Sequence, residues 1–298
     1  MQTKAGFTCH HEASSVAETA RHILRAQLRV MESNAERATR LHSAKAIHDL
    51  RLAIRRFRAA LRIFGGLMPD MIVKRLRRRL LVLNRQLGPI RDAQVWLGLL
   101  TRTVGRRERP LPAEWVQCVK MATETCATRV KMLDQALKSA PFWEAHECCN
   151  HLQCDKPCGD QAVRPFLAAK LQRAYVRLFR IGAPVAGATG EDVHAFRRHY
   201  RRARYLSEFT EPLLGEPVDK LTHYLKRVST ALGERHDVEV QIQILTGMKK
   251  PPKDLFVMLD HKKHAAQQDF DTAWKKLMAP HFRKHVRTNL RVVKRAGK

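Results

Sequence analysis

A chain of 298 residues with 56 Lys and Arg against 28 Asp and Glu carries a net charge of +28 at pH 7. A charge so far from zero opposes compaction and indicates a polyanionic partner, such as nucleic acid, an anionic membrane or a phosphate polymer. Seven cysteines at irregular spacing argue against a disulfide framework, no apolar run is long enough to span a membrane, and the polar N-terminus lacks the apolar core of a signal peptide. We therefore expect a cytoplasmic protein that does not insert into membranes.

Long segments rich in Leu, Ala, Arg and Glu, interrupted by only 14 Gly and 13 Pro, predict an all-α protein. The first predicted helices span residues 15–38, 43–64, 70–87, 92–104 and 113–138, and the second set spans 163–181, 191–211, 217–232, 237–247 and 255–278. We expect linkers at 105–112, 146–160 and 182–190. This organisation predicts a first helical bundle over 12–140, a linker over 141–162 and a second bundle over 163–298. The basic tail after Pro280 is either a further helix of the second bundle or a solvated end.

An internal repeat relates the two sets of helices. Residues 47–58 (IHDLRLAIRRFR) align with residues 193–204 (VHAFRRHYRRAR) at a constant offset, so that one histidine and four arginines coincide. Residues 87–95 (LGPIRDAQV) align further on with 232–240 (LGERHDVEV), and residues 24–31 (LRAQLRVM) resemble 172–179 (QRAYVRLF) upstream. Three matching blocks in the same order predict a tandem of two related helical bundles.

The repeated helix carries a basic face and an apolar face, because an α-helix turns about 100° per residue. The basic face holds His48, Arg51, Arg55, Arg58 and Arg62 in the first copy, and His194, Arg197, Arg201 and Arg204 in the second. Glu208 stands where the first copy has Arg62. A solvated helix face usually mixes both signs of charge, so these nearly single-signed rows favour binding of a linear anion over plain solvation. Arg outnumbers Lys by 36 to 20, and the guanidinium fork matches two phosphate oxygens at once.

Further candidate anion-binding residues lie beside these rows or on neighbouring helices. They are Arg21, Arg25, Arg29, Arg56, Lys74, Arg78 and Arg85 in the first half, and Lys170, Arg173, Arg177, Arg198, Arg202, Lys220, His223 and Arg227 in the second. On the third predicted helix, Arg75, Arg77 and Arg79 point elsewhere and are interpreted as plain surface.

The repeated Leu-Gly-x-x-(Arg/His)-Asp block is interpreted as a helix stop and restart. Gly88 and Gly233 would cap one helix. Asp92 and Asp237 would cap the next helix or pair with an arginine of the repeated helix, which makes them structural rather than catalytic residues.

These motifs resemble a known family. A helix with His-x-x-Arg-x-x-x-Arg-Arg-x-Arg, followed after roughly thirty residues by Leu-Gly-x-x-Arg-Asp and present twice, is similar to the CHAD domain (conserved histidine α-helical domain) over about residues 15–245. The resemblance implies two four-helix bundles related by pseudo-twofold symmetry, with a basic cleft or pore between them. It also implies non-catalytic binding of inorganic polyphosphate, often at polyphosphate granules. By position, the binding residues would be His48, Arg51, Arg55 and Arg58, with His194, Arg197, Arg201 and Arg204.

The second copy departs from the family pattern at two places. It has His236 where the first copy has Arg91, and Glu208 where the first copy has Arg62. These departures predict weaker binding by the second bundle. No cofactor and no resident metal is expected.

Two other functions remain open. Arginine rows also bind nucleic-acid phosphates, although neither stacking platforms nor zinc-finger spacings are visible, so we expect weak, non-specific nucleic-acid binding. The enzyme alternative is a metal-dependent phosphohydrolase, suggested by the pairs His48-Asp49 and His236-Asp237. These pairs occupy non-equivalent places in the repeat, and the sequence has no P-loop or His-Glu-x-x-His element.

The segment HECCNHLQCDKPC is a separate feature. Its side chains Cys148, Cys149, Cys154, Cys158, His146 and His151 are of the types that bind zinc, but their spacing matches no standard zinc pattern. We interpret the segment as a linker between the bundles with free thiols.

Overall fold

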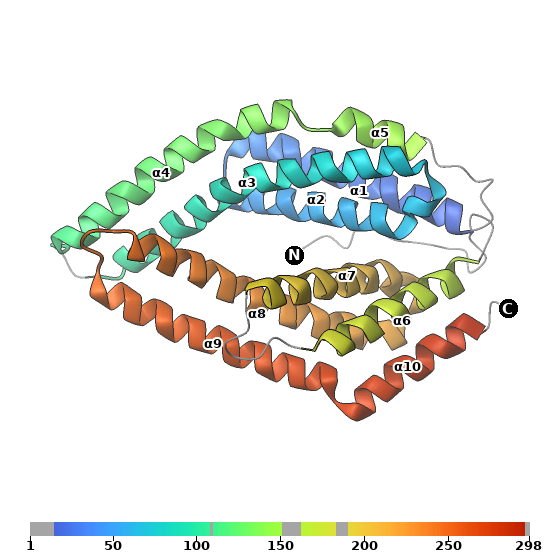
Figure 1. Ribbon diagram of the computed structural model, residues 1–298. Helices are drawn as coiled ribbons and strands as arrows, with labels where there is room; N and C mark the ends of the chain where they lie inside the picture. The colour runs from blue at the N-terminus through green and yellow to red at the C-terminus, as the bar shows by residue number, and fades with distance from the viewer. Residues whose placement is uncertain (1–14, 108–109, 151–161, 183–189, 296–298) are drawn as a thin grey trace.

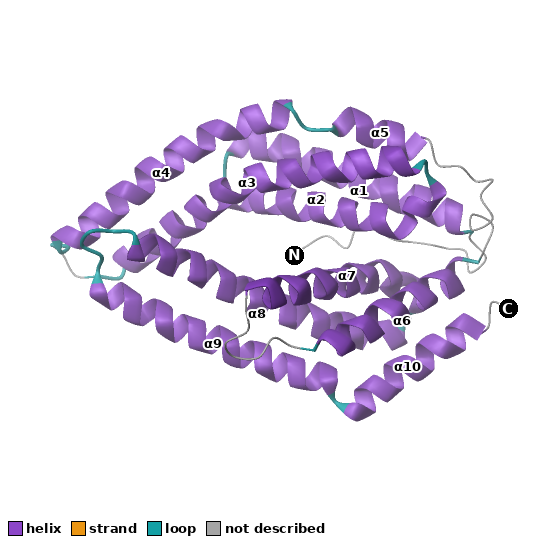
Figure 2. Ribbon diagram, in the orientation of Figure 1, coloured by secondary structure: helices purple, strands orange, loops and turns teal. Residues whose placement is uncertain are grey.

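The computed structural model describes residues 15–107, 110–150, 162–182 and 190–295 (Figure 1). The first half contains α1 (Val16–Leu41), α2 (Ala44–Phe64), the short 3-10 helix η1 (Gly65–Leu67), α3 (Asp70–Val104), α4 (Ala113–Lys138) and α5 (Phe142–Asn150). The second half contains α6 (Val163–Ile181), α7 (Gly190–Leu214), α8 (Glu216–Thr246), α9 (Lys253–Met278) and α10 (Pro280–Arg295). Short loops join the helices and the described residues contain no strand, which confirms the predicted all-α class (Figure 2).

The local sequence explains where the first helices begin and end. Ser15 accepts a hydrogen bond from the backbone N–H of Glu18, whose side chain accepts one from the N–H of Ser15, and this capping box starts α1. His42 takes the left-handed conformation that ends α1, and Ser43 caps α2. Along α2 the predicted apolar face, including Leu50 and Phe57, is buried.

Both helices predicted to break at the Leu-Gly block are continuous, so the predicted stop and restart is wrong. α3 runs through Gly88 and α8 runs through Gly233. At Gly88 the backbone carbonyl accepts a hydrogen bond from Nη1 of Arg51 at 3.3 Å, which ties α3 to α2. Asp92 therefore lies inside α3 and is not a helix cap; it pairs with Arg51 at 3.8 Å.

The helices of each half pack on one another in chain order. α2 lies between α1 and α3, and α5 covers α1 and α3; α7 lies between α6 and α8, and α10 covers α6 and α8. One large hydrophobic core includes residues of both halves, with Phe64 of α2 stacked on Phe166 of α6 at a ring distance of 6.5 Å. The basic tail after Pro280 is thus a helix of the second half. The pseudo-twofold relation and the cleft or pore stay predictions.

A second, smaller core joins the halves at one end of the molecule. It contains Trp96 and Leu100 of α3, Trp115 of α4, Leu245 of α8 and Leu255 of α9. In Figure 1 the long helices α4 and α9 run along opposite outer sides and approach each other at this end. Contacts at this end and at the α2–α7 crossing thus both hold the halves together. No helix in the described part of the chain is both long enough and apolar enough to cross a membrane.

Helix α5 occupies the start of the stretch predicted as a linker. Its Cys148 and Cys149 are buried, and burial raises the pKa of these thiols to about 11 and about 12. His146 contacts Glu32 at 2.6 Å. His151, Cys154 and Cys158 lie outside the described residues. Among the residues that are described, no three or more His, Cys, Asp or Glu side chains gather as metal ligands would.

Candidate anion-binding site

The basic faces of α2 and α7 meet the middle of α3 and α8. The residues of this central cluster are His48, Arg51 and Arg55 of α2, Arg91 of α3, Arg197 and Arg201 of α7, and His236 of α8. Partial burial, together with the charges of Arg197 and Arg55, lowers the pKa of Arg201 to about 10. Because Arg55 belongs to the first half and Arg201 to the second, the structure brings the two predicted rows close together.

The central cluster also contains carboxylates, which partly balance its charge. Asp92 contacts Arg51, and Asp237 of α8 lies close enough to Arg91 for their charges to interact. Burial raises the pKa of Asp237, whereas Arg91 and His236 lower it. Both aspartates come from the repeated Leu-Gly block, so the two copies of this block face the same cluster.

A second group of arginines has no such balance. The residues of this Arg58 cluster are Arg58 and Arg62 of α2, Arg77 and Arg85 of α3, and Arg202 of α7. Burial, together with the charges of three neighbouring arginines, lowers the pKa of Arg58 to about 10. Among the described residues no carboxylate lies within 4.0 Å of any member. The Nε atoms of Arg58 and Arg77 are buried without a hydrogen-bond partner.

Unpartnered buried donors and crowded like charges both cost folding free energy. A bound anion would satisfy the donors and offset the repulsion. The Arg58 cluster therefore has the electrostatic properties of an anion-binding site.

Three histidines lie among these arginines. Burial lowers the pKa of His48, His199 and His236, and the nearby charges of Arg91, Arg177 and Arg197, respectively, lower it further. Each imidazole is consequently biased toward its neutral form while the arginines lack an anionic partner.

Two of the candidate arginines, Arg56 and Arg204, are held in an ion-pair network. Glu208 of α7 is buried and accepts hydrogen bonds from Arg56 of α2 and, at 2.7 Å, from Nε of Arg204. Nε of Arg56 also donates to Gln27 of α1 at 3.2 Å. Although burial opposes it, the carboxylate of Glu208 raises the pKa of Arg204. Glu208 thus joins the two halves, in addition to shortening the basic row.

The model of the CHAD domain matches residues 22–246, which is most of the chain. The chain belongs to the CHAD-domain family. Its fold is similar to the crystal structure of the CHAD domain from the plant Ricinus communis, with 20% identity, a TM-score of 0.63, and coverage of 94% of this chain and 93% of that chain. It is also similar to PptA from Streptomyces chartreusis, with 19% identity, a TM-score of 0.62, and coverage of 88% and 100%. At such identities the likeness shows the fold alone. No curated protein matches the chain significantly in sequence.

In this CHAD domain the remaining candidates lie apart from the two clusters or at their edges. Lys170 donates to the carbonyl of Ile63 at 2.7 Å and thereby ties α6 to α2. Arg25 lies near Cys149 of α5, and Lys74 pairs with Asp70 at 2.6 Å. Arg177 and Arg198 lie near His199, and Arg78 lines a surface cavity of α3. Arg21 is half-buried on α1. The exposed candidates are Arg29, Arg173, Lys220, His223 and Arg227. The side chain of His194 lies outside the described residues.

Four residues of the two clusters and their surroundings are not among the binding residues predicted from the sequence. Arg77, interpreted as surface, faces Arg58, and a signal existed because Arg77 and Arg85 are eight residues apart and share a helix face. Arg91 and His236 align in the repeat but were considered only as a departure from it. His199 lies outside the repeated motif and gave no signal.

Proposed function

We propose that this CHAD domain binds inorganic polyphosphate with the facing helices of its two halves and catalyses no reaction. The observation that carries the proposal is the Arg58 cluster, five arginines from three helices without a carboxylate partner among the described residues. Guanidinium groups form short, charge-assisted hydrogen bonds with phosphate oxygens, and a linear polyphosphate presents such oxygens at every unit. The same ligand would continue from the Arg58 cluster to the central cluster, since Arg51, Arg55 and Arg58 share one face of α2.

A phosphate polymer without bases suits this site better than a nucleic acid. Aromatic residues near the clusters, Phe57, Tyr200 and Tyr205, are buried and present no face on which a base could stack. The arginines approach one another from facing helices, so a thin ligand that enters between them reaches more of these side chains than a wide duplex. We propose that the protein acts in the cytoplasm, at polyphosphate granules where these form.

The proposal assigns a positioning role to the aspartates of the central cluster. Asp92 contacts Arg51, and Asp237 interacts with Arg91 and His236. Carboxylates in such pairs orient arginines and limit their mutual repulsion. They serve anion binding in this account, and no step of hydrolysis is assigned to them.

A competition titration tests the proposed function. Labelled long-chain polyphosphate is displaced by unlabelled polyphosphate, duplex DNA or RNA at matched phosphate concentration and near-physiological salt. The wild type is compared with a variant in which Arg51, Arg55, Arg197 and Arg201 are changed to Ala. A control with the same loss of charge changes the exposed Lys249, Lys250, Lys275 and Lys276 to Ala.

We expect polyphosphate to compete at least about tenfold better than nucleic acid, which is roughly 1.4 kcal/mol. The arginine variant should lose that margin and the lysine control should keep it. Equal competition by nucleic acid, or unchanged binding by the arginine variant, would contradict the proposal. The arginine rows would then be part of a general basic surface.

A further inference from the structure

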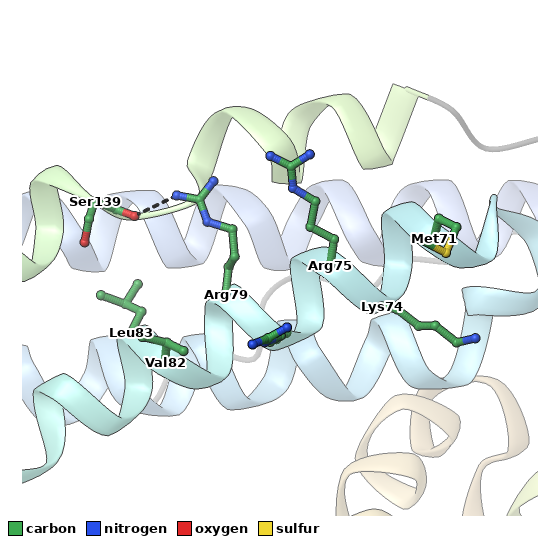
Figure 3. A pocket seen from close by; sticks show the side chains of 8 residues that line it. Met71, Lys74, Arg75, Arg79, Val82, Leu83 and Ser139 are labelled. Atoms are coloured by element: carbon green, nitrogen blue, oxygen red, sulfur yellow. Dashed lines mark hydrogen bonds between the residues drawn. The ribbon is translucent and has the colours of Figure 1, made fainter.

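A surface cavity of about 650 Å³ is lined by side chains of α3 and by Ser139, which follows α4 (Figure 3). Its lining residues are Met71, Lys74, Arg75, Arg78, Arg79, Val82, Leu83 and Ser139. Figure 3 shows Lys74 pointing toward the second half, whereas Arg75 and Arg79 point to the opposite side, toward α4 and α5. Basic side chains thus extend from the side of α3 that faces the second half to its outer side.

The positions of these residues on α3 connect the cavity to the Arg58 cluster. Arg77 faces Arg58, and Lys74 and Arg78 lie within about 60–100° of Arg77 around the helix, given about 100° per residue. Arg75 lies further round in the same direction as Arg78. Together these cations form an arc that begins at the Arg58 cluster and ends in the cavity.

Two cations of the cavity are available to a ligand. Arg75 and Arg78 are exposed, and among the described residues no carboxylate lies within 4.0 Å of either. Lys74 pairs with Asp70, but both side chains are exposed and such a surface pair is weak. Arg79 is already engaged, because it pairs with Glu144 and donates to the carbonyl of Ser139 at 3.2 Å. It therefore forms a wall of the cavity.

The second half has only a broken counterpart of this arc. At the offset that aligns Leu87 with Leu232, Arg75 aligns with Lys220 and Arg78 with His223, and both of these side chains are exposed. Lys74, however, aligns with Asp219, and Arg77 aligns with the buried Thr222. An anionic ligand that leaves the clusters thus finds a continuous cationic path over α3 and an interrupted one at the matching place on α8.

We propose that this arc is an outer extension of the polyphosphate site, along which a long phosphate chain passes Lys74 and Arg78 and reaches Arg75. The inference rests on the proposed function and specifies where a long phosphate chain continues beyond the two clusters. Short phosphate chains are held by the Arg58 and central clusters alone, and long chains gain the additional contacts on α3. Affinity therefore depends on chain length through residues of the first half.

The test compares two probes, tripolyphosphate and long-chain polyphosphate, on three proteins. The wild type is measured beside Arg75→Ala/Arg78→Ala and beside Lys275→Ala/Lys276→Ala, which removes the same charge from the exposed side of α9. We expect the α3 variant to bind the long chain about three- to tenfold more weakly and to lower the salt slope of its affinity by about two, one for each lost phosphate contact. Its affinity for tripolyphosphate should stay within about twofold of wild type.

Two results would overturn the inference. One is an equal loss for both probes, since the arc would then contribute to every complex or to folding. The other is a loss for the long chain no larger than that of the α9 control, since net charge would then explain it. Neither result resembles failure of the proposed function, in which the wild type itself shows no preference for polyphosphate over nucleic acid.

Discussion

Arg58 and Arg204 occupy matching positions in the two copies of the repeated helix, yet their surroundings act on them in opposite directions. Burial and three neighbouring arginines lower the pKa of Arg58. Arg204 is half-buried, but its pKa is raised because it donates to Glu208. The charged form is thus disfavoured in one copy and stabilised in the other.

One aligned position accounts for most of this difference. The first copy has Arg62 and the second has Glu208, and a carboxylate there recruits Arg56 from the opposite half as well as Arg204. At the matching place Arg62 faces Arg202, and each lacks a carboxylate partner among the described residues. The comparison indicates that Glu208 of the second half helps to join the halves, whereas the matching arginines of the first half lack a carboxylate partner among the described residues.

Removing the Glu208 carboxylate, which links the two halves, should have the largest effect on stability. We expect Glu208→Ala to lower the free energy of unfolding by about 2–4 kcal/mol, because the half-buried guanidinium groups of Arg56 and Arg204 would lose their partner. Chemical denaturation measures this loss. The control is Glu211→Ala, whose more exposed pair with Lys226 at 3.5 Å should cost less than about 1 kcal/mol. Similar losses in the two variants would show that Glu208 does not link the halves.

Substitutions in the Arg58 cluster should mainly reduce the binding of polyphosphate. We expect Arg58→Ala/Arg77→Ala to lower the affinity for polyphosphate by roughly thirty- to a hundredfold, or about 2–3 kcal/mol, since each side chain offers a charge-assisted hydrogen bond. Titration of labelled polyphosphate measures this change. The control is Arg129→Ala/Arg180→Ala, which removes two exposed charges from α4 and α6. If the control variant bound polyphosphate as weakly as the cluster variant, the loss of net charge would explain both results.

The matching arginines should respond to the same substitution with opposite signs. Arg58→Met removes an unpartnered buried Nε and relieves repulsion, so we expect the ligand-free protein to gain up to about 1 kcal/mol of stability. Arg204→Met removes a partner of Glu208 and should cost about 2 kcal/mol. Thermal and chemical unfolding of both variants measure the difference. A loss of stability in both would remove the contrast between the halves.

The smallest effect concerns pH and the histidines of the central cluster. The pKa values of His48 and His236 lie below 6.5 in the free protein, and a bound polyanion would raise them by offsetting the arginine charges. The complex then binds more protons than the free protein, so affinity should rise as pH falls from about 7.5 toward 6. Titrations at both pH values, in buffers of different ionisation enthalpy, measure the proton uptake.

The same histidines affect folding with the opposite pH dependence. The unfolded chain, with an ordinary pKa of 6.5, binds more protons than the free folded protein in this window, so ligand-free stability should fall as pH falls. A His48→Gln/His236→Gln variant should weaken both trends. An affinity independent of pH in the wild type would place the polyanion away from these histidines.

Local periodicity predicted much of this molecule, because the features concerned repeat within one helix. The apolar face of α2 is buried as predicted. Its arginine row lies on a separate face, where Arg51 and Arg58 approach other arginines. The continuity of α3 was not predictable in this way. Gly88 resembles a helix cap in sequence, but it lies inside α3, where its carbonyl accepts a hydrogen bond from Arg51 of another helix.

Contacts between the halves could not be predicted from the sequence. Arg56 and Glu208 are 152 residues apart, and no pattern within either helix indicates that they meet. Arg77 was assigned to the surface because the pairing of α3 with Arg58 was unknown. The sequence therefore shows where the positive charges lie, and the packing of α2 against α7 determines which arginines pair with a carboxylate.

A crystal structure of the protein with tripolyphosphate tests the central claim most directly. The account predicts phosphate density between the halves, with oxygens in hydrogen-bond distance of Arg58, Arg77 and at least one arginine of α7, and with the Arg56–Glu208 pair intact. Density confined to exposed lysines or to the outer faces of α8 and α9, with the Arg58 cluster unchanged, would contradict it.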